Sequence, residues 1–174
     1  SALAHTLSMV DVAPRLAAQS PGPGCGKTVL LEAISNLTPR PVTAASITAA
    51  VVFRIIEEVK PTLFLDEADQ MLKDRSSPLV AVLNSSHRKS TAYVWRTEET
   101  VPGQFVPVRF STWAAVMFAG IRELPPTLQD RSIVLRLQRA RPGEVKQHIR
   151  DGKCDALAEC GQKLARWAED TVEL

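Results

Sequence analysis

A glycine-rich segment constrains the fold of this chain more than any other feature of its sequence. Residues 20–28 read Ser-Pro-Gly-Pro-Gly-Cys-Gly-Lys-Thr, between residues 15–19 (Arg-Leu-Ala-Ala-Gln), which are typical of a short buried strand, and a helix-compatible stretch at residues 28–36. Glycine adopts positive φ angles and has no side chain in the way, so several backbone N–H groups can turn toward one point. A strand, a turn of this kind and a helix N-terminus together form a cradle for an anion. The segment therefore predicts a phosphate-binding loop in an α/β fold.

The residue types in this loop assign its candidate ligands. We expect the backbone of residues 22–28 to surround phosphate oxygens, Lys27 to reach the β- and γ-phosphates, and the Thr28 hydroxyl to bind Mg²⁺. The predicted nucleotide contacts are Gly22, Gly24, Cys25, Gly26, Lys27 and Thr28. Pro21 stands where the consensus G-x-x-x-x-G-K-[ST] has its first glycine. The alternative is an ordinary Gly/Pro turn between a strand and a helix.

An apolar stretch further along the chain ends on two acidic residues. Residues 62–65 read Thr-Leu-Phe-Leu and lead directly into Asp66 and Glu67. Ligands of open α/β sheets bind beyond the carboxyl ends of the strands. We therefore expect Asp66 to hold Mg²⁺ through water, and Glu67 to polarise the water that attacks ATP. The alternative is that both acids complement the dipole of a following helix.

The order of the predicted elements indicates the fold class. Strands are predicted at residues 15–19, 41–43, 62–65, 114–118 and 133–137, and helices at residues 2–9, 28–36, 46–59 (with Ser46 as N-cap), 79–86 and 147–173. Two further β-like runs, residues 92–96 and 105–110, predict an inserted hairpin, and Pro107 confines the second run to an edge.

Five core strands, with a glutamate after the metal aspartate, fit the additional-strand class of P-loop NTPases. In that class an extra strand lies between the loop strand and the acidic strand. The predicted fold is therefore a three-layer α/β domain with a parallel sheet of about five strands. Residues 1–142 are predicted as the ATPase core and residues 143–174 as a C-terminal helical tail of the same domain.

Five segments of the sequence carry a family resemblance. They are residues 20–28, residues 62–69 (Thr-Leu-Phe-Leu-Asp-Glu-Ala-Asp), residues 83–88 (Leu-Asn-Ser-Ser-His-Arg), residues 109–113 (Arg-Phe-Ser-Thr-Trp) and residues 124–133. In these segments the chain resembles an AAA+/superfamily-3-like ATPase domain, of a bacterial domain-of-unknown-function family found in plasmid, prophage and primase–helicase-type proteins. The resemblance spans about residues 10–142. It implies oligomeric ATP hydrolysis and a role in DNA replication or mobile-element maintenance.

The resemblance also implies functional roles for residues outside the loop. Arg131 stands where AAA+-like domains present an arginine finger to ATP on a neighbouring subunit, which implies a homo-oligomer, a ring in the full-length parent. AAA+ proteins carry a polar sensor at the end of the strand predicted at residues 114–118, but here that strand ends in Phe118-Ala119-Gly120. Either Arg122 or a residue from elsewhere substitutes for the sensor, or turnover is slow. Arg122 is also the rival of Arg131 as the finger. The alternative for Arg131 is an ion pair with Asp130 or with the helical tail.

A basic and aromatic segment is the candidate for contact with single-stranded DNA. The candidate residues are His87, Arg88, Lys89, Tyr93 and Arg96. Positive charges neutralise phosphates and aromatic rings stack on bases, and related helicases insert a DNA-tracking hairpin at this place. The alternative is that Tyr93 and Trp95 pack on the core and that the charges form an ordinary solvated surface.

Composition adds only broad limits. The chain has 174 residues, of which 45% are hydrophobic and 23% charged, as in one ordinary globular domain. A net charge of +2 gives no general argument for nucleic acid. The three cysteines lead us to expect a reduced, cytoplasmic protein. Neither a membrane span nor a secretory signal is visible in the sequence. The first residue is Ser1 rather than methionine, as expected of a segment from a longer protein.

The leading functional hypothesis is a helicase-like ATPase motor that acts on DNA, with ATP and Mg²⁺ as cofactors. A second hypothesis is a nucleotide-dependent switch or loader that hydrolyses little ATP. A third is a degenerate structural module of a larger replication protein.

Overall fold

A five-stranded parallel sheet forms the centre of the molecule. The computed structural model describes residues 1–141, 143–144 and 154–172. The sheet has the order β2-β3-β6-β1-β7, formed by β2 (Pro41–Ala44), β3 (Thr62–Leu65), β6 (Ala115–Gly120), β1 (Arg15–Gln19) and β7 (Ile133–Arg136). Strand β6 pairs with both β1 and β3, so a strand from later in the chain separates the loop strand from the acidic strand, as predicted. β3 and β6 are buried along their whole length, which explains their continuous apolar sequences.

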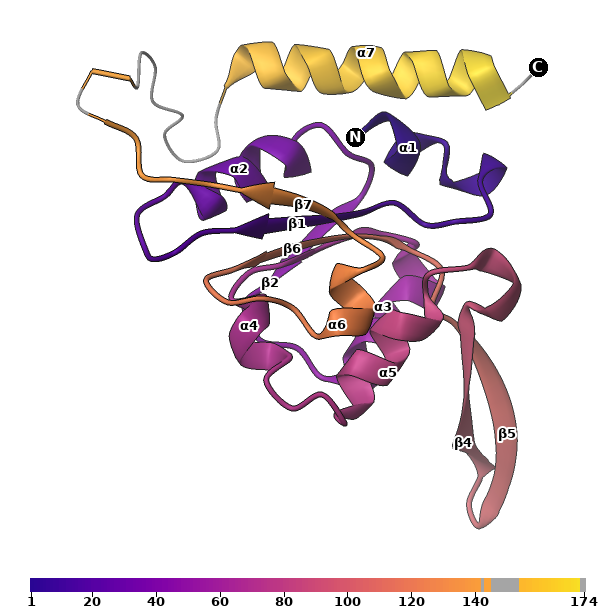
Figure 1. The fold of residues 1–174 in the computed structure, drawn as a ribbon. Helices are drawn as coiled ribbons and strands as arrows, with labels where there is room; N and C mark the ends of the chain where they lie inside the picture. Colours follow the sequence, from indigo (N-terminus) through magenta and orange to yellow (C-terminus); the bar gives the residue numbers. More distant parts are fainter. Residues whose placement is uncertain (142, 145–153, 173–174) are drawn as a thin grey trace.

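Helices cover both faces of this sheet (Figure 1). One face carries α2 (Lys27–Ser35), and the other carries α3 (Ala49–Val59) and α5 (Pro78–Ser85). Successive residues of a strand point to opposite faces. Leu63 accordingly belongs to the buried cluster with α3 and α5, whereas Phe64 packs with Leu31 of α2 in the other cluster. The helix–sheet–helix arrangement follows from strands that are apolar on both sides.

Short elements complete the fold. They are α1 (Ala2–His5), the 3₁₀ turns η1 (Leu7–Met9) and η2 (Lys89–Thr91), α4 (Ala68–Met71), α6 (Pro126–Gln129) and the C-terminal α7 (Asp155–Val172). In α7, Gly161 lies so close to the Asn36 carbonyl that an added Cβ would come within 2.5 Å of the oxygen. In the described part of the chain, no helix combines the length and the apolarity that crossing a membrane requires.

A two-stranded antiparallel hairpin projects from the α3–α5 side of the molecule (Figure 1). It consists of β4 (Tyr93–Val101) and β5 (Gln104–Ser111) and is inserted between α5 and β6, as predicted. Phe110 of β5 packs on Phe53 of α3, with ring centroids 4.9 Å apart. Both strands are edges, so Pro107 costs no hydrogen bond to a further strand.

Several predicted boundaries differ from the structure. Helix α3 begins at Ala49 with Thr48 at its N-cap, so the prediction of Ser46 as N-cap was wrong. Ile47 packs against the core, and the chain is still extended at Thr48. The helix therefore begins three residues after Ser46. The hairpin strands extend beyond the predicted ends, because antiparallel pairing continues through polar residues. The predicted start of the tail helix at Gln147 and its end at Glu173 lie outside the described residues.

Candidate nucleotide-binding site

The glycine-rich loop connects β1 to α2 at the carboxyl edge of the sheet. Gly24 and Gly26 have φ angles of 74° and 82°, a region that residues with a Cβ rarely adopt. An added Cβ would meet nothing within 4 Å at either position, so backbone conformation rather than crowding requires glycine there. Gly26 is the N-cap of α2, and the first N–H groups of a helix have no partner within the helix. The loop therefore has the form expected of an anion cradle.

Lys27 lies folded back over this loop. Its Nζ donates to Ser20 Oγ at 2.6 Å and to the Gly22 carbonyl at 3.3 Å. Ser20 Oγ itself donates to the Gly22 carbonyl at 2.7 Å. Both acceptors are neutral, and an ammonium group binds anionic phosphate oxygens more strongly than neutral oxygens. Lys27 is thus held over the loop by two neutral acceptors.

Two predicted metal ligands meet at the loop. Thr28 Oγ1 donates to Asp66 Oδ2 at 3.3 Å, although the two residues are 38 positions apart. Asp66 Oδ1 also accepts from the Glu67 backbone N–H at 2.9 Å. A hydroxyl and a carboxylate suit Mg²⁺, which uses one or two protein oxygens, substrate phosphates and water rather than an all-protein cage. The described residues contain no group of three or more His, Cys, Asp and Glu side chains placed to hold a metal.

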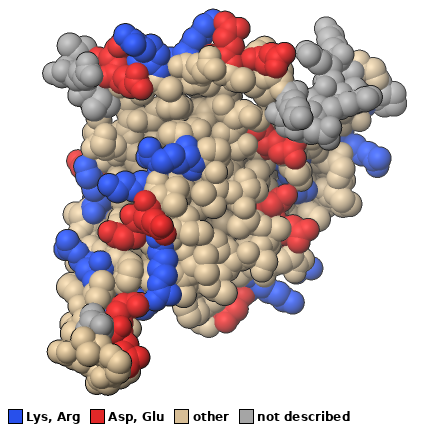
Figure 2. Space-filling view, turned by 180° about the vertical axis from the view of Figure 1, so that it is seen from behind, with Lys and Arg blue, Asp and Glu red and all other residues tan. Residues whose placement is uncertain are grey.

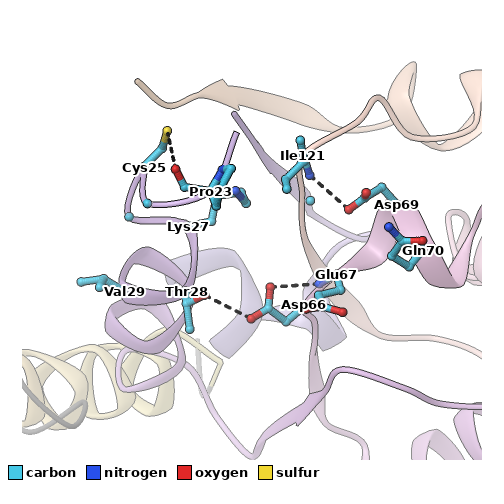
Figure 3. Close-up of a pocket in the computed structure, with 13 residues that line it drawn as sticks. Pro23, Cys25, Lys27, Thr28, Val29, Asp66, Glu67, Asp69, Gln70 and Ile121 are labelled. Atoms are coloured by element: carbon cyan, nitrogen blue, oxygen red, sulfur yellow. Dashed lines mark hydrogen bonds between the residues drawn. The ribbon is translucent and has the colours of Figure 1, made fainter. Parts of the chain in front are cut away.

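A cavity of about 430 Å³ lies between the loop and the ends of β3 and β6 (Figure 3). It falls within the range of about 300–1,000 Å³ that is typical of small-molecule sites. Its lining comprises the loop from Pro23 to Thr28, Val29, Asp66, Glu67, Asp69, Gln70, Gly120 and Ile121. Of the predicted site residues, the structure brings Gly24, Cys25, Gly26, Lys27, Thr28, Asp66 and Glu67 to this cavity; Gly22 accepts from Lys27 but does not line it.

Glu67 has an unusual backbone conformation. Its φ angle is 51°, and it is the N-cap of α4. A left-handed conformation costs a residue with a Cβ roughly 1–2 kcal/mol, and such strain concentrates at functional sites. The conformation turns the chain sharply from β3 into α4, and it brings Glu67 and Asp69 to the cavity together with Asp66.

Asp69 is a cavity residue that the sequence did not identify. Its Oδ1 accepts from the Ile121 backbone N–H at 3.1 Å, just beyond the end of β6. A Cβ added to Gly120 would come within 2.6 Å of the same oxygen. The last residues of β6 have no polar side chain of their own, and a residue from elsewhere takes that place, because α4 brings the Asp69 carboxylate there. Gly120 does not have a positive φ, so the reason for a glycine at this strand end is the close approach of Asp69, which the sequence does not reveal.

The two candidate arginine fingers lie at different edges of the sheet. Arg122 is exposed in the loop after β6, next to the cavity-lining Ile121. Arg131 precedes β7, which runs parallel to β1, so Arg131 lies at the opposite edge from the cavity. Its Nη1 donates to the Asn84 carbonyl at 3.1 Å. The ion pairs found among the described residues include neither an Asp130–Arg131 pair nor one between Arg131 and the tail.

The hairpin has two chemically different faces. Tyr93 and Trp95 are 40% and 56% exposed and touch edge to face, with centroids 6.4 Å apart. They do not pack on the core, and the guanidinium of Arg109 lies 5.4 Å from the Tyr93 ring. Arg96 instead faces α3, where its guanidinium lies 5.1 Å from the Phe53 ring centroid. The structure therefore separates Arg96 from the aromatic pair with which it was grouped.

The basic residues before the hairpin have different surroundings. Arg88 is exposed, whereas Lys89 Nζ donates to the Ser8 carbonyl at 2.8 Å. His87 is half-buried; burial, followed by the charges of nearby arginines, lowers the pKa of its imidazole. On the face shown in Figure 2, the described Lys and Arg side chains lie among Asp and Glu side chains rather than in one continuous basic surface.

Comparison with family models gives no match, and comparison with curated proteins gives none. Among solved structures, the chain is similar to a JCV helicase crystallised with an N-aryl acetamide that carries a thiazolopyridine group. The TM-score is 0.45 and the sequence identity 13%, and the alignment covers 80% of this chain and 39% of that chain. A likeness at this level carries no functional conclusion, which leaves the geometry of the cavity as the basis for one.

Proposed function

We propose that this domain binds ATP with Mg²⁺ and hydrolyses it, as a P-loop ATPase of the additional-strand, AAA+-like class. The observation that carries the proposal is the meeting of Lys27, Thr28 and Asp66 at one cavity beyond the carboxyl ends of β1 and β3. The position of β6 between those two strands supports the class. The proposed setting is a helicase-like motor in DNA replication or mobile-element maintenance.

Each residue has a role that its position allows. The amides of the loop and Lys27 bind the β- and γ-phosphates, and Thr28 with Asp66 holds Mg²⁺. Bound Mg²⁺ supplies positive charge that stabilises the phosphates. Glu67 orients a water molecule toward the γ-phosphorus and accepts its proton, so that ADP and phosphate leave. Arg131 of another copy is the proposed arginine finger, with Arg122 as its rival.

Replacing Lys27 with alanine tests the proposal at its centre. Lys27→Ala removes a charge-assisted contact and should weaken the binding of a fluorescent ATP analogue by about 10- to 100-fold. The matched control is Lys73→Ala, which removes an exposed lysine that does not line the cavity. If the two variants bind the analogue equally well, Lys27 does not contact phosphate.

The switch or loader remains the second candidate, because β6 ends without a polar side chain of its own. The acidic side chain of Asp69 lies in its place and already accepts a hydrogen bond from a backbone N–H. A motor predicts ATP turnover that single-stranded DNA stimulates, whereas a switch predicts tight ATP binding with little turnover under both conditions. ATPase assays of the protein with and without an oligonucleotide separate the two candidates, and absence of ATP binding would leave the degenerate module.

The proposed contact with single-stranded DNA involves the outer face of the hairpin and the basic residues before it. Tyr93 and Trp95 offer exposed rings for base stacking, and Arg88 and Lys89 offer charges for phosphates. Each phosphate contact on a single strand adds about 0.7 to the slope of log affinity against log salt. The double variant Arg88→Ala/Lys89→Ala should therefore reduce that slope by about 1.4.

The control for this measurement is Lys163→Ala/Arg166→Ala on α7, which removes the same number of charges from exposed positions. Equal slopes for the two double variants, measured with a labelled oligonucleotide across a salt series, would show that Arg88 and Lys89 do not contact DNA phosphates.

A further inference from the structure

The backbone N–H of the cavity-lining Ile121 is bound to a carboxylate of the same chain. Asp69 Oδ1 accepts from this N–H at 3.1 Å, and Asp69, Gly120 and Ile121 all line the cavity. Ile121 directly follows β6, which lies between β1 and β3 in the sheet. The N–H is therefore placed between the glycine-rich loop, which follows β1, and the acidic pair, which follows β3 (Figure 3).

Under the proposed function, the terminal phosphate of ATP lies at the same place. The loop amides and Lys27 would hold the β- and γ-phosphates, and Asp66 would hold Mg²⁺ on the side of β3. The end of β6 lies between these two groups, so a γ-phosphate bound by both of them faces the Ile121 N–H. Backbone N–H groups are common donors to phosphate oxygens, and this one becomes a donor to the nucleotide once its present acceptor leaves.

Asp69 and a phosphate oxygen compete for this donor. Both are anionic, and two anions that meet at one hydrogen atom repel each other. The charged side chains that line the cavity are one cation, Lys27, and three anions, Asp66, Glu67 and Asp69. Asp66 and Glu67 have proposed roles with Mg²⁺ and with water. The charge of Asp69 has no such role and opposes a phosphate at the end of β6.

The Asp69 side chain can turn away without a movement of the helix that carries it. Ala68 and Leu72, at the two ends of α4, belong to the buried core cluster, and this packing fixes the backbone of α4. Asp69 Oδ1 is the far end of a flexible side chain, and Gly120 has no Cβ beside it. Rotation of the carboxylate alone therefore breaks the bond with the Ile121 N–H and exposes this donor to the cavity.

We propose that Asp69 is an internal competitor of the nucleotide, which ATP displaces from the Ile121 N–H and ADP does not. This role rests on the proposed function and specifies which nucleotide the cavity detects. In the nucleotide-free chain, the Asp69 carboxylate accepts from this N–H. In the ATP-bound chain, an oxygen of the γ-phosphate accepts from it and Asp69 turns away. ADP has no phosphate that reaches the end of β6, so Asp69 keeps its partner, and its rotamer distinguishes the two nucleotides.

The first experiment measures hydrogen exchange of the Ile121 amide by NMR, in chains with labelled isoleucine and with the signal assigned by an Ile121→Val variant. Without nucleotide, Asp69→Ala removes the acceptor and should speed this exchange by about 3- to 10-fold. A non-hydrolysable ATP analogue with Mg²⁺ should restore slow exchange in the Asp69→Ala chain, because the γ-phosphate replaces the carboxylate, whereas ADP should not. Exchange that stays fast with the ATP analogue bound, or that ADP slows equally, would overturn the proposal.

The second experiment measures affinities. Asp69→Asn keeps the shape of the side chain and removes its charge, so it should bind a fluorescent ATP analogue about 10-fold more tightly. Its affinity for ADP should change much less, because ADP does not displace residue 69. The matched control is Asp11→Asn, which removes an exposed carboxylate that does not line the cavity. Equal affinities of the two variants for the ATP analogue, or an equal gain for ATP and ADP, would contradict the competition.

The role of Asp69 and the proposed function fail in different ways. If the unmodified chain binds neither ATP nor ADP, the proposed function is wrong and the role of Asp69 falls with it. If the unmodified chain binds the ATP analogue and Lys27→Ala weakens that binding, the nucleotide site stands. An Ile121 amide that then exchanges at the same rate in the unmodified and Asp69→Ala chains would refute the role of Asp69 alone.

Discussion

Replacing Arg131 with alanine should lower the ATP turnover of the assembled protein by about 10³–10⁵-fold. Charge spreads over the phosphoryl group as it transfers, and a guanidinium brought in from outside the cavity stabilises it. The position of Arg131, at the opposite edge of the sheet from the cavity, restricts this role to a neighbouring copy. Steady-state turnover, measured at protein concentrations where the chains assemble, gives the size of the effect.

Mixing of variants distinguishes Arg131 from Arg122. A Lys27→Ala subunit keeps its arginines, so it should restore turnover to an Arg131→Ala subunit whose cavity is intact. An Arg122→Ala subunit should gain nothing from the same partner, because Arg122 follows β6 at the cavity edge of its own copy. Lack of rescue of Arg131→Ala in assembled mixtures would show that Arg131 does not act across an interface.

Replacing Glu67 with glutamine should lower turnover by about 10²–10⁴-fold while ATP binding persists. Glutamine has the same shape and must adopt the same left-handed backbone, whose φ is 51° in the structure. The substitution therefore removes the proton acceptor and leaves the strain in place. Single-turnover hydrolysis reports the chemical step, and the fluorescent ATP analogue reports binding.

The control for Glu67 is Glu123→Gln, which removes an exposed carboxylate that does not line the cavity. If Glu67→Gln hydrolyses ATP at the rate of this control, Glu67 is only an acid that caps the start of α4.

The sequence predicted the parts of the fold that local patterns encode. The strand at residues 15–19 has the predicted bounds, because a Ser-Pro-Gly turn follows Gln19 directly. Helices α4 and α6 were missed, since each has only four residues and no repeating apolar pattern. The N-cap of α3 was misplaced because the packing of Ile47, a tertiary contact, outweighs the capping propensity of Ser46.

The residues of the candidate site likewise fall into those that the sequence identifies and those that only the structure reveals. The loop and the acidic pair are continuous in sequence, and their residue types identify them. Side chains alternate along β4, so Arg96 lies on the opposite face from Tyr93 and Trp95. The sequence alone was therefore enough to separate Arg96 from these two aromatic residues. By contrast, Asp69 meets Ile121 from 52 positions away. Contacts of this kind depend on the sheet order and have no local signature.

Asp69 in its present position and a side chain at position 120 cannot occupy this strand end at the same time. A Cβ at position 120 would come within 2.6 Å of Asp69 Oδ1, closer than such atoms approach in real structures. A relative of this chain that carries a serine, threonine or asparagine at position 120 must therefore shorten or redirect residue 69. Because Oδ1 is the far end of a flexible side chain, rotation of the Asp69 carboxylate would make room for a side chain at position 120. That rotation would break the hydrogen bond with the Ile121 N–H, so a polar residue at position 120 would take over this strand end from Asp69.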